Sequence, residues 1–153
     1  MIAVIQRVKK ASVSVEGTVV GSCAAGLLIL LGVATNDTEE DANALARKIV
    51  NLRIFTDEND KLNLSLKDVG GEVLVVSNFT LLANYKKGNR PDYLNSARPE
   101  IAEKLYEYFT GLISSEIAHV ETGAFGEHME INTVCDGPIT ITMDSNVLIN
   151  KKV

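Results

Sequence analysis

One apolar stretch constrains the fold of this chain more than any other feature of its sequence. It runs from Ala24 to Ala34, spans about eleven residues and includes Gly26 and Gly32. A helix that crosses a bilayer needs roughly 20 apolar residues, so this stretch is too short to span a membrane. An unbroken apolar run of this length is typical of a strand buried on both faces. We therefore expect a central strand at 27–33 and no association with a membrane.

Periodic segments on either side of this strand predict the other elements. Apolar residues recur at helical spacing in 39–51, behind a Thr38 and Asp41 pair that resembles a capping box, and again in a helix that begins at Pro99. The remaining apolar segments have the character of strands: 2–8, 12–15, 19–23, 52–55, 72–79, 129–134 and 139–143. This order predicts an α+β fold, with a curved, barrel-like, mostly antiparallel sheet packed by two helices. A length of 153 residues fits a single domain, 1–153.

The charge of the chain limits how it can contact nucleic acid. Its net charge is −5, which argues against a protein that coats nucleic acid with a basic face, but not against one that holds only the last nucleotide or two. Lys86, Lys87 and Arg90 form a local basic patch beside Gly88 and Pro91. Two interpretations of this patch stay open, a solvated loop and a phosphate contact near the mouth of a binding site.

Neither the cysteines nor the histidines predict a metal site or a cofactor. Cys23 and Cys135 make no disulfide framework, and we expect both to be small, reduced, apolar side chains. His119 and His128 have no H-x-x-x-H or C-x-x-C spacing around them. The first residues have no basic region followed by a cleavage site, so we expect a cytoplasmic protein that uses no cofactor and no metal.

The common catalytic templates are missing, since no G-x-S-x-G elbow and no phosphate-binding Gly-rich loop is present. One unusual segment is Ser77-Asn78-Phe79-Thr80-Leu81, where an apolar strand ends in three hydrogen-bonding side chains. Thr80 or Ser77 is a candidate nucleophile, although neither has a histidine nearby in sequence to activate it. The alternative is a polar strand end that satisfies loop backbone.

A second unusual segment is Asp136-Gly137-Pro138, followed by the alternating residues 139–142. Proline cannot donate to a strand ladder, so it should begin a strand or lie at an edge. A cis bond before Pro138 would reverse the backbone tightly. The carbonyl oxygens of Gly137 and Pro138 would then point the same way, as two acceptors for a cation. The residues alone favour the commoner trans bond.

At these two segments the sequence resembles the D-aminoacyl-tRNA deacylase family. The family pattern pairs Ser-Gln-Phe-Thr-Leu with Asn-x-Gly-Pro-x-Thr, and here these segments read Ser-Asn-Phe-Thr-Leu at 77–81 and Cys-Asp-Gly-Pro-Ile-Thr at 135–140. The similarity extends along nearly the whole chain, and further collinear matches lie at 3–8, 26–28, 48–55, 63–66, 87–91 and 121–126. So many matches in one order are far more specific than either motif alone.

The resemblance implies a cytoplasmic hydrolase that cleaves the ester between a D-amino acid and tRNA, and also glycine mischarged on tRNA(Ala). It implies a homodimer in which Gly137 and Pro138, joined by a cis bond, enter the active site of the other subunit. The α-ammonium and α-carbon of the substrate would lie against the two carbonyl oxygens. An L side chain would then meet rigid main chain, while a D side chain would point to solvent and glycine would have nothing to clash.

The resemblance also assigns roles to residues in the pocket. The segment beside the ester comprises the catalytic Ser77, Phe79 and Thr80 and the substrate-binding Asn78. The walls around the 3′-terminal adenosine of aminoacyl-tRNA are Ala102, Phe125 and Met129. Arg7 would brace the Gly-Pro turn with its five donors, or else form an ordinary salt bridge at a strand edge.

Two mechanisms and three activities remain open at this stage. Thr80 is either a nucleophile, or a neighbour of backbone N–H groups that stabilise an oxyanion while the ribose 2′-hydroxyl orients water; we favour the second. The chain departs from the family pattern at Asn78, which replaces Gln, at Cys135, which replaces Asn, and at residues 83–84. Because of these departures, two alternatives to a deacylase are kept: a tRNA 3′-end binding module without activity, and an esterase with Thr80 as its nucleophile.

Overall fold

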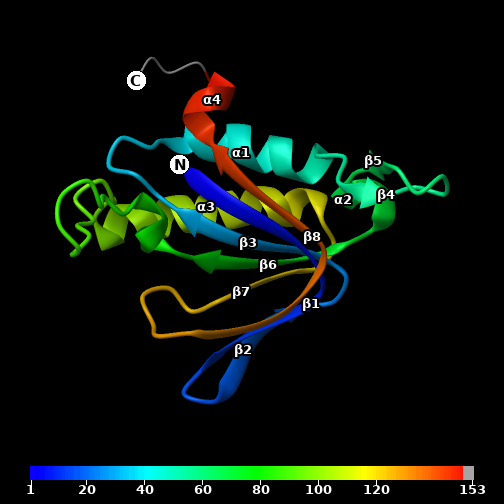
Figure 1. Cartoon of the computed structure of the whole chain (residues 1–153), viewed down its shortest axis with the longest axis horizontal. Coiled ribbons are helices and arrows are strands. Elements are labelled where there is room, and N and C mark those ends of the chain that lie inside the picture. The colour runs from blue at the N-terminus through cyan, green and yellow to red at the C-terminus, as the bar shows by residue number, and fades with distance from the viewer. Residues whose placement is uncertain (150–153) are drawn as a thin grey trace.

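The computed structural model describes residues 1–149 and combines one main sheet with helices on one of its faces (Figure 1). The strands are β1 Ile2–Val15, β2 Thr18–Cys23, β3 Gly26–Gly32, β4 Phe55–Thr56, β5 Leu62–Leu64, β6 Glu72–Ser77, β7 Val120–Thr122 and β8 Glu130–Asp144. The helices are α1 Glu39–Asn51, α2 Leu66–Val69, α3 Pro99–Glu116 and α4 Ser145–Ile149, with a 3₁₀ turn, η1, at Phe79–Leu82. The predicted α+β class is confirmed.

The main sheet has six strands in the order β2-β1-β3-β6-β7, and β8 pairs with β1 as well. β1 is antiparallel to β2, β3 and β8, as the prediction of a mostly antiparallel sheet requires. The pairs β3–β6 and β6–β7 are parallel. Each parallel pair follows from a long helix, α1 or α3, that carries the chain back to the starting end of the sheet. Strand patterns alone do not show these crossovers, so the two parallel pairs were not predicted from the sequence.

The sheet curves until its two ends nearly meet. The hairpin between β1 and β2 turns at Glu16 and Gly17, whose φ angles are 49° and 80°, which suits the tight turns that follow the twist of a hairpin. This hairpin brings β2 against β7, where a Cβ added to Gly21 would lie 2.2 Å from the carbonyl oxygen of Thr122. The backbone N–H of Ser22 also donates to the carboxylate of Glu121 at 2.6 Å. The predicted barrel-like curvature is therefore confirmed.

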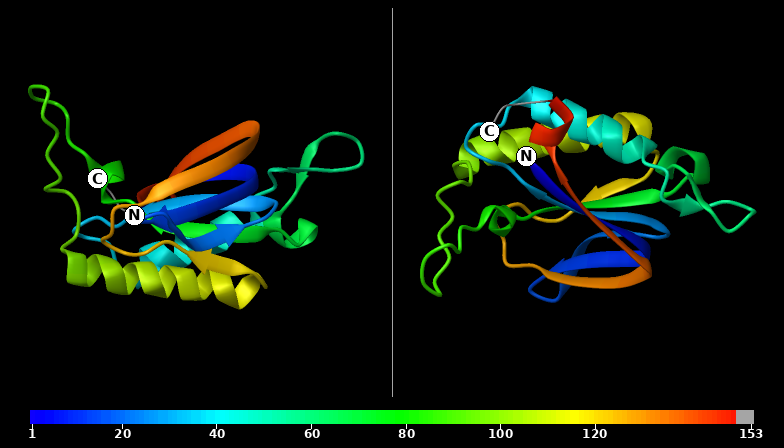
Figure 2. Two further views of the ribbon diagram at one scale, coloured as in Figure 1. Left: turned by 90° about the horizontal axis from the view of Figure 1, so that it is seen from below. Right: turned by 45° about the horizontal axis from the view of Figure 1, so that its top comes forward.

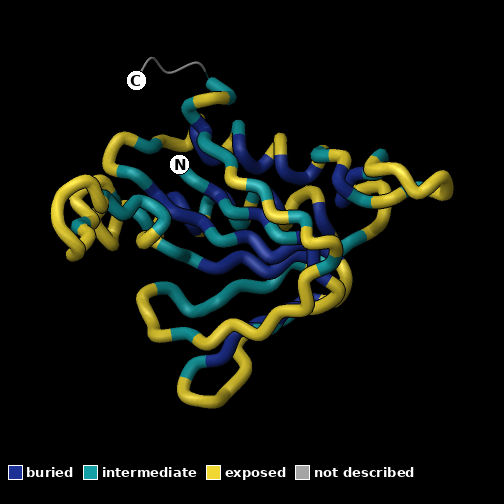
Figure 3. The backbone as a smooth tube through the Cα atoms, in the orientation of Figure 1, coloured by how far each residue is buried: buried dark blue, intermediate teal, exposed yellow. Residues whose placement is uncertain are grey.

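β3 is apolar throughout because each of its faces meets a different core. Leu27, Ile29 and Leu31 belong to the core shared with α1 and α3. Leu28 points to the other side, into the smaller core enclosed by the curved sheet, where it joins Leu74 of β6. β3 and β6 consequently form the most buried band of the backbone, whereas β8 is largely exposed (Figure 3). The predicted central strand is confirmed.

The two long helices lie next to each other on one side of the sheet (Figure 2). α1 begins as predicted, because Thr38 and Asp41 satisfy each other's backbone in a capping box. α3 begins at Pro99, as predicted, and its buried side includes Tyr106 and Phe109. The single-turn helices α2 and α4 are too short to show a period, so the sequence did not reveal them.

Four of the predicted strand assignments were wrong in their bounds. The strands expected at 2–8 and 12–15 are one continuous strand, β1. The strand expected at 52–55 is reduced to the two residues of β4, and the one expected at 72–79 ends at Ser77. The strands expected at 129–134 and 139–143 are one continuous strand, β8, whose pairing with β1 becomes irregular opposite Val8. The bond between Gly137 and Pro138 is cis, but the chain continues along β8 instead of reversing there. No helix within residues 1–149 is both long and apolar enough to cross a bilayer.

Candidate functional site

A hollow of about 710 Å³ opens at the point where β6 ends. It gathers seven of the predicted site residues from three distant parts of the chain: Ser77, Asn78, Phe79, Thr80, Ala102, Phe125 and Met129. Apolar side chains from the sheet, including Leu30 and Val76, form part of the lining. A hollow of this size with apolar walls and a few polar groups is typical of a small-molecule or nucleoside site.

Residues 77–80 line the hollow because the chain leaves the sheet after Ser77. Asn78 still donates its backbone N–H to the carbonyl oxygen of Leu31 at 2.8 Å, and the 3₁₀ turn η1 then begins at Phe79. The first N–H groups of a helical turn have no partner inside that turn. Within residues 1–149 no hydrogen bond engages the backbone N–H of Phe79 or Thr80. Two free donors therefore lie on the segment that lines the hollow.

The Thr80 hydroxyl is engaged with its neighbour rather than with a base. Its Oγ1 donates to the side-chain oxygen of Asn78 at 2.5 Å. An amide oxygen accepts a hydrogen bond but does not take up the proton, so this contact does not activate Thr80 as a nucleophile. His128 lines the same hollow, which sequence spacing did not reveal. No hydrogen bond joins His128 to Thr80 in the described structure.

The aromatic walls of the hollow are fixed by their neighbours. The rings of Phe79 and Tyr93 meet edge to face, with centroids 5.1 Å apart. Phe125 packs at 5.8 Å against Tyr106, whose hydroxyl donates to the carbonyl oxygen of Val75 at 2.9 Å. Burial raises the pKa of Tyr106 to about 12, so this hydroxyl stays protonated. Such flat, held walls suit the face of a heterocyclic base.

The loop between η1 and α3 adds two residues that the sequence did not predict. Tyr93 and Ser96 line the hollow, and Ser96 Oγ donates to the carbonyl oxygen of Phe79 at 3.2 Å. They are separated from Thr80 by more than ten residues and belong to no periodic segment. Only the chain's scarcity of aromatic residues singles out Tyr93.

The remaining predicted site residues, Gly137, Pro138 and Arg7, do not line this hollow. Arg7 is opposite Leu27 in the sheet, whereas the last residue of β6 is opposite Leu31. At about 3.3 Å per residue and 4.8 Å per strand, the Gly-Pro segment lies on the order of 20 Å from the end of β6 in the same chain. In Figure 1 the bend of β8 and the end of β6 are on opposite sides of the molecule.

Arg7 joins the Gly-Pro segment to the chain that follows α1. It is 8% exposed, and its Nε donates to the carbonyl oxygen of Asp136 at 3.2 Å. Its Nη1 donates to the carbonyl oxygen of Ile54 at 2.9 Å and to Thr56 Oγ1 at 3.3 Å. Nε also lies 3.3 Å from a carboxylate oxygen of Asp136. The carbonyl contacts and the salt bridge, which the sequence left as alternatives, are both present.

The structure also assigns different environments to the two cysteines. Both are free thiols; Cys23 is buried, and burial is the main reason that its pKa rises to about 11. Cys135 lies on β8 and is exposed. No cluster of three or more potential metal ligands occurs within residues 1–149.

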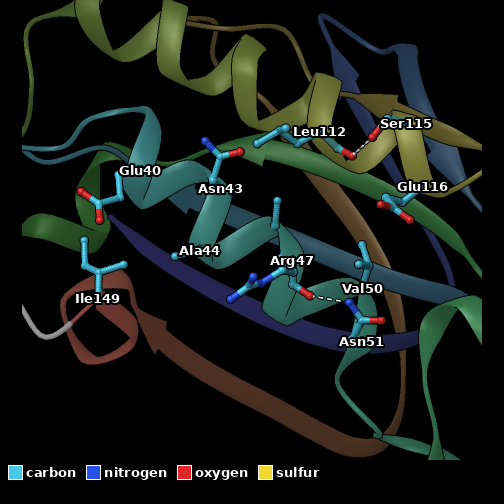
Figure 4. Close-up of a pocket in the computed structure, with 11 residues that line it drawn as sticks. Glu40, Asn43, Ala44, Arg47, Val50, Asn51, Leu112, Ser115, Glu116 and Ile149 are labelled. Carbon is cyan, nitrogen blue, oxygen red and sulfur yellow. Dashed lines mark hydrogen bonds between the residues drawn. The ribbon is translucent and has the colours of Figure 1, made fainter.

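A second hollow, of about 440 Å³, lies on the outer side of α1 and α3 (Figure 4). None of the predicted site residues line it. Two of its amide side chains are bound to their own helix, since Asn43 donates to the carbonyl oxygen of Glu39 and Asn51 to that of Arg47. This hollow contributes nothing to the site at the end of β6.

Comparison with known proteins decides the family. The model of the D-Tyr-tRNA(Tyr) deacylase family matches residues 4–144. The chain belongs to this family. A deacylase of this kind is a hydrolase acting on an ester bond, so the predicted family and enzyme class are confirmed.

Relatives of this deacylase family match almost end to end. The chain is 58% identical to the D-aminoacyl-tRNA deacylase of Caldicellulosiruptor saccharolyticus and 56% identical to that of Thermosipho africanus, in both cases over 95% of this chain and 97% of the relative. Among solved structures, a c-Myc DNA unwinding element binding protein superposes with a TM-score of 0.89 at 37% identity, covering 94% of this chain and 98% of that one. A probable eukaryotic D-amino acid tRNA deacylase, 15% identical, shares the fold with a TM-score of 0.81, over 94% of this chain and 98% of its own.

Proposed function

We propose that this protein hydrolyses the ester bond of D-aminoacyl-tRNA, and of glycyl-tRNA(Ala), in the cytoplasm as a single-domain homodimer. The observation that carries the proposal is the hollow at the end of β6, which brings together all seven pocket residues implied by the family resemblance. Membership of the deacylase family supports the reaction type. The ester, the amino acid and the terminal nucleoside each have a place in this site.

The 3′-terminal adenosine of the tRNA occupies the apolar part of the hollow. Ala102 of α3 and Met129 of the segment before β8 both line it, and Phe125 adds a ring held by Tyr106. Stacking on such a ring does not depend on the sequence of the tRNA. The enzyme therefore accepts many tRNAs, because every one of them ends in the same nucleoside.

The Gly-Pro segment acts on the site of the partner subunit. In its own chain it lies about 20 Å from the end of β6, so it cannot reach its own pocket. Among residues 1–149, β8 pairs only with β1 and leaves its other edge without a partner strand, with Ile131 and Val134 exposed on β8. Proteins normally cover such edges. Association of two copies through this region would cover the edge and bring each turn toward the other pocket.

Discrimination between D- and L-amino acids rests on main chain. The carbonyl oxygens of Gly137 and Pro138 of the partner subunit face the α-ammonium group, and an L side chain would collide with this backbone. Rejection by steric conflict does not require a better contact with the D form. Glycine is accepted because it has no side chain to collide. Arg7 supports the arrangement through its hydrogen bond to the carbonyl oxygen of Asp136.

Hydrolysis proceeds by positioning rather than by covalent catalysis. The free backbone N–H groups of Phe79 and Thr80 stabilise the oxyanion that forms when water attacks the ester carbonyl. The ribose 2′-hydroxyl of the substrate orients that water. The engagement of the Thr80 hydroxyl with Asn78 supports this route over a threonine nucleophile.

The function is tested with four substrates and the purified protein. D-Tyr-tRNA and Gly-tRNA(Ala) should be deacylated, while L-Tyr-tRNA and p-nitrophenyl acetate remain intact. Binding of tRNA without any turnover would instead identify a 3′-end binding module. Cleavage of the simple ester, lost on Thr80→Ala, would identify a threonine esterase. Equal turnover of D- and L-Tyr-tRNA would refute the proposed chiral selection.

A further inference from the structure

The loop between η1 and α3 carries a concentration of positive charge that the pocket does not use. Its tip contains Lys86, Lys87 and Arg90, all exposed, in a chain whose net charge is −5. None of the three has an ion-pair partner within residues 1–149. The single carboxylate of the loop, Asp92, is engaged elsewhere, since it accepts from the Asn84 amide at 3.0 Å and from the backbone N–H of Leu94 at 3.3 Å.

This loop is attached to the pocket at both of its ends. It leaves directly from η1, and it returns through Tyr93, whose ring packs against Phe79, and Ser96, which donates to the Phe79 carbonyl oxygen. Reciprocal backbone hydrogen bonds between Asn84 and Asp92, of 2.8 and 3.0 Å, close its base. The tip therefore projects from a fixed base whose residues Tyr93 and Ser96 line the hollow. Figure 2 shows the green segment ahead of α3 extending away from the rest of the molecule.

We propose that Lys86, Lys87 and Arg90 bind the phosphates of the single-stranded nucleotides that precede the terminal adenosine of tRNA. The inference rests on the proposed function, because it takes the adenosine to occupy the hollow. The base of the loop forms part of the wall of the hollow, so the loop is placed to meet a strand that leaves the hollow on that side. Unpaired Lys and Arg side chains on an acidic protein are then a local site for a polyanion, and their contacts carry no sequence preference.

The expected partner of these three residues is a short single strand of RNA, rather than a duplex that lies along a large basic surface. Three cations on one short loop can neutralise only a few phosphates, which agrees with a net negative charge for the rest of the chain. Each such contact releases counterions and makes binding depend on salt. The contribution should therefore appear with a substrate that has phosphates and be absent with one that ends at the nucleoside.

The test compares D-Tyr-tRNA with 2′(3′)-O-D-tyrosyl adenosine, which has no phosphate. The variant K86A/K87A/R90A should lose about tenfold or more in kcat/KM on the tRNA at 0.1 M salt, and its log–log salt slope should fall by about 2. Its kcat/KM on the adenosine ester should equal that of the wild type. The charge-conserving variant K86R/K87R/R90K should behave as the wild type on both substrates.

A matched control removes three exposed lysines elsewhere, in K48A/K61A/K104A, with the same change in net charge. It should keep full kcat/KM on the tRNA. An equal loss of kcat/KM in this control would show a general effect of charge. If K86A/K87A/R90A loses kcat/KM equally on both substrates, the loop shapes the pocket instead. Either result overturns the inference, and so does an unchanged kcat/KM of K86A/K87A/R90A on the tRNA. If the wild type cleaves neither substrate, the proposed function itself fails.

Discussion

The Thr80 hydroxyl lies 2.5 Å from the side-chain oxygen of Asn78 and donates its hydrogen bond to it. The family pattern has Gln at this position, and the shorter Asn still reaches its neighbour two residues on. Because the acceptor is an amide oxygen, the contact holds the hydroxyl without drawing off its proton. Of the two mechanisms that the sequence left open, this contact favours the one in which Thr80 is not the nucleophile.

Thr80→Ala should retain most of the deacylation rate. The change removes one hydrogen bond, which is worth about 0.5–1.5 kcal/mol, so the loss in kcat on D-Tyr-tRNA should stay within about tenfold. Thr80→Ser keeps a hydroxyl and serves as the matched control. A loss beyond about a thousandfold, with folding and tRNA binding intact, would establish Thr80 as the nucleophile.

Arg7→Met should destabilise the protein by about 2–4 kcal/mol. The change leaves the carbonyl oxygens of Ile54 and Asp136 without their donor in a buried setting, and each unsatisfied group costs about 1–3 kcal/mol. Urea unfolding measures the free energy of unfolding. Arg53→Met is the control, since Arg53 is exposed and makes one hydrogen bond, to the Asn63 carbonyl oxygen; a similar loss there would contradict the special role of Arg7.

Mixed dimers should recover activity from two defective chains. Gly137→Ala damages the turn, because φ is 129° and the new Cβ would lie 2.8 Å from the backbone nitrogen of Ile139. Ala102→Phe fills the hollow. Random pairing of the two chains makes half of the dimers mixed, each with one intact site, so co-expression should restore about a quarter of wild-type turnover. Ile101→Phe, at a half-exposed neighbouring position, controls for the added ring. No recovery would mean that each site is built within one chain.

Tyr106 should make the protein less stable as the pH rises from about 10 to 12. Burial raises the pKa of Tyr106 from 10.0 to about 12, so the folded state holds the proton more tightly than the unfolded state does. This contribution to stability is fully present below pH 10 and is lost as the pH passes through 12, by about 2–3 kcal/mol. Tyr106→Phe should lack this part of the pH dependence in urea unfolding. An unchanged profile would contradict the assignment.

The two cysteines should differ strongly in reactivity. The thiolate is the reactive form, and the raised pKa and burial of Cys23 keep it a protonated thiol at pH 8. Cys135 is exposed in a single chain, so in the dissociated protein it should react with Ellman's reagent at least about tenfold faster. Cys135→Ser should leave one slow thiol, and Cys23→Ser one fast thiol. Rapid labelling of Cys135→Ser would show that the barrel interior opens readily.

The parts of the fold that could be predicted are those that depend on local sequence patterns. The central strand and both long helices each depend on neighbouring residues, so spacing and composition revealed them. The parallel pairing of β3 with β6 depends on where α1 returns the chain, and no local pattern records that. The continuity of β8 through Gly137 and Pro138 was missed for a similar reason, because β1 supplies the partner that holds the strand together.

The candidate site was predictable only as far as the family resemblance reached. Spacing alone marked the Ser77–Thr80 segment as unusual without assigning it a chemistry. The resemblance added Ala102, Phe125 and Met129, which the structure brings to the same hollow. Tyr93 and His128 escaped both approaches, since they lie on loops whose return to the pocket is set by tertiary packing.

The interval between the hollow and the Gly-Pro turn is set by β3, from Leu27 opposite Arg7 to Leu31 opposite Ser77. Removing two residues from such a strand keeps every side chain on its own face but shortens the part of the interval that runs along the strand by about 7 Å. Such a change would also break the register of β3 with β1 and β6, so the core of one molecule and the proposed fit between two molecules depend on the same strand length. The length of the buried strand β3 thus sets the distance between the hollow and the Gly-Pro segment, two surfaces that do not touch within one chain.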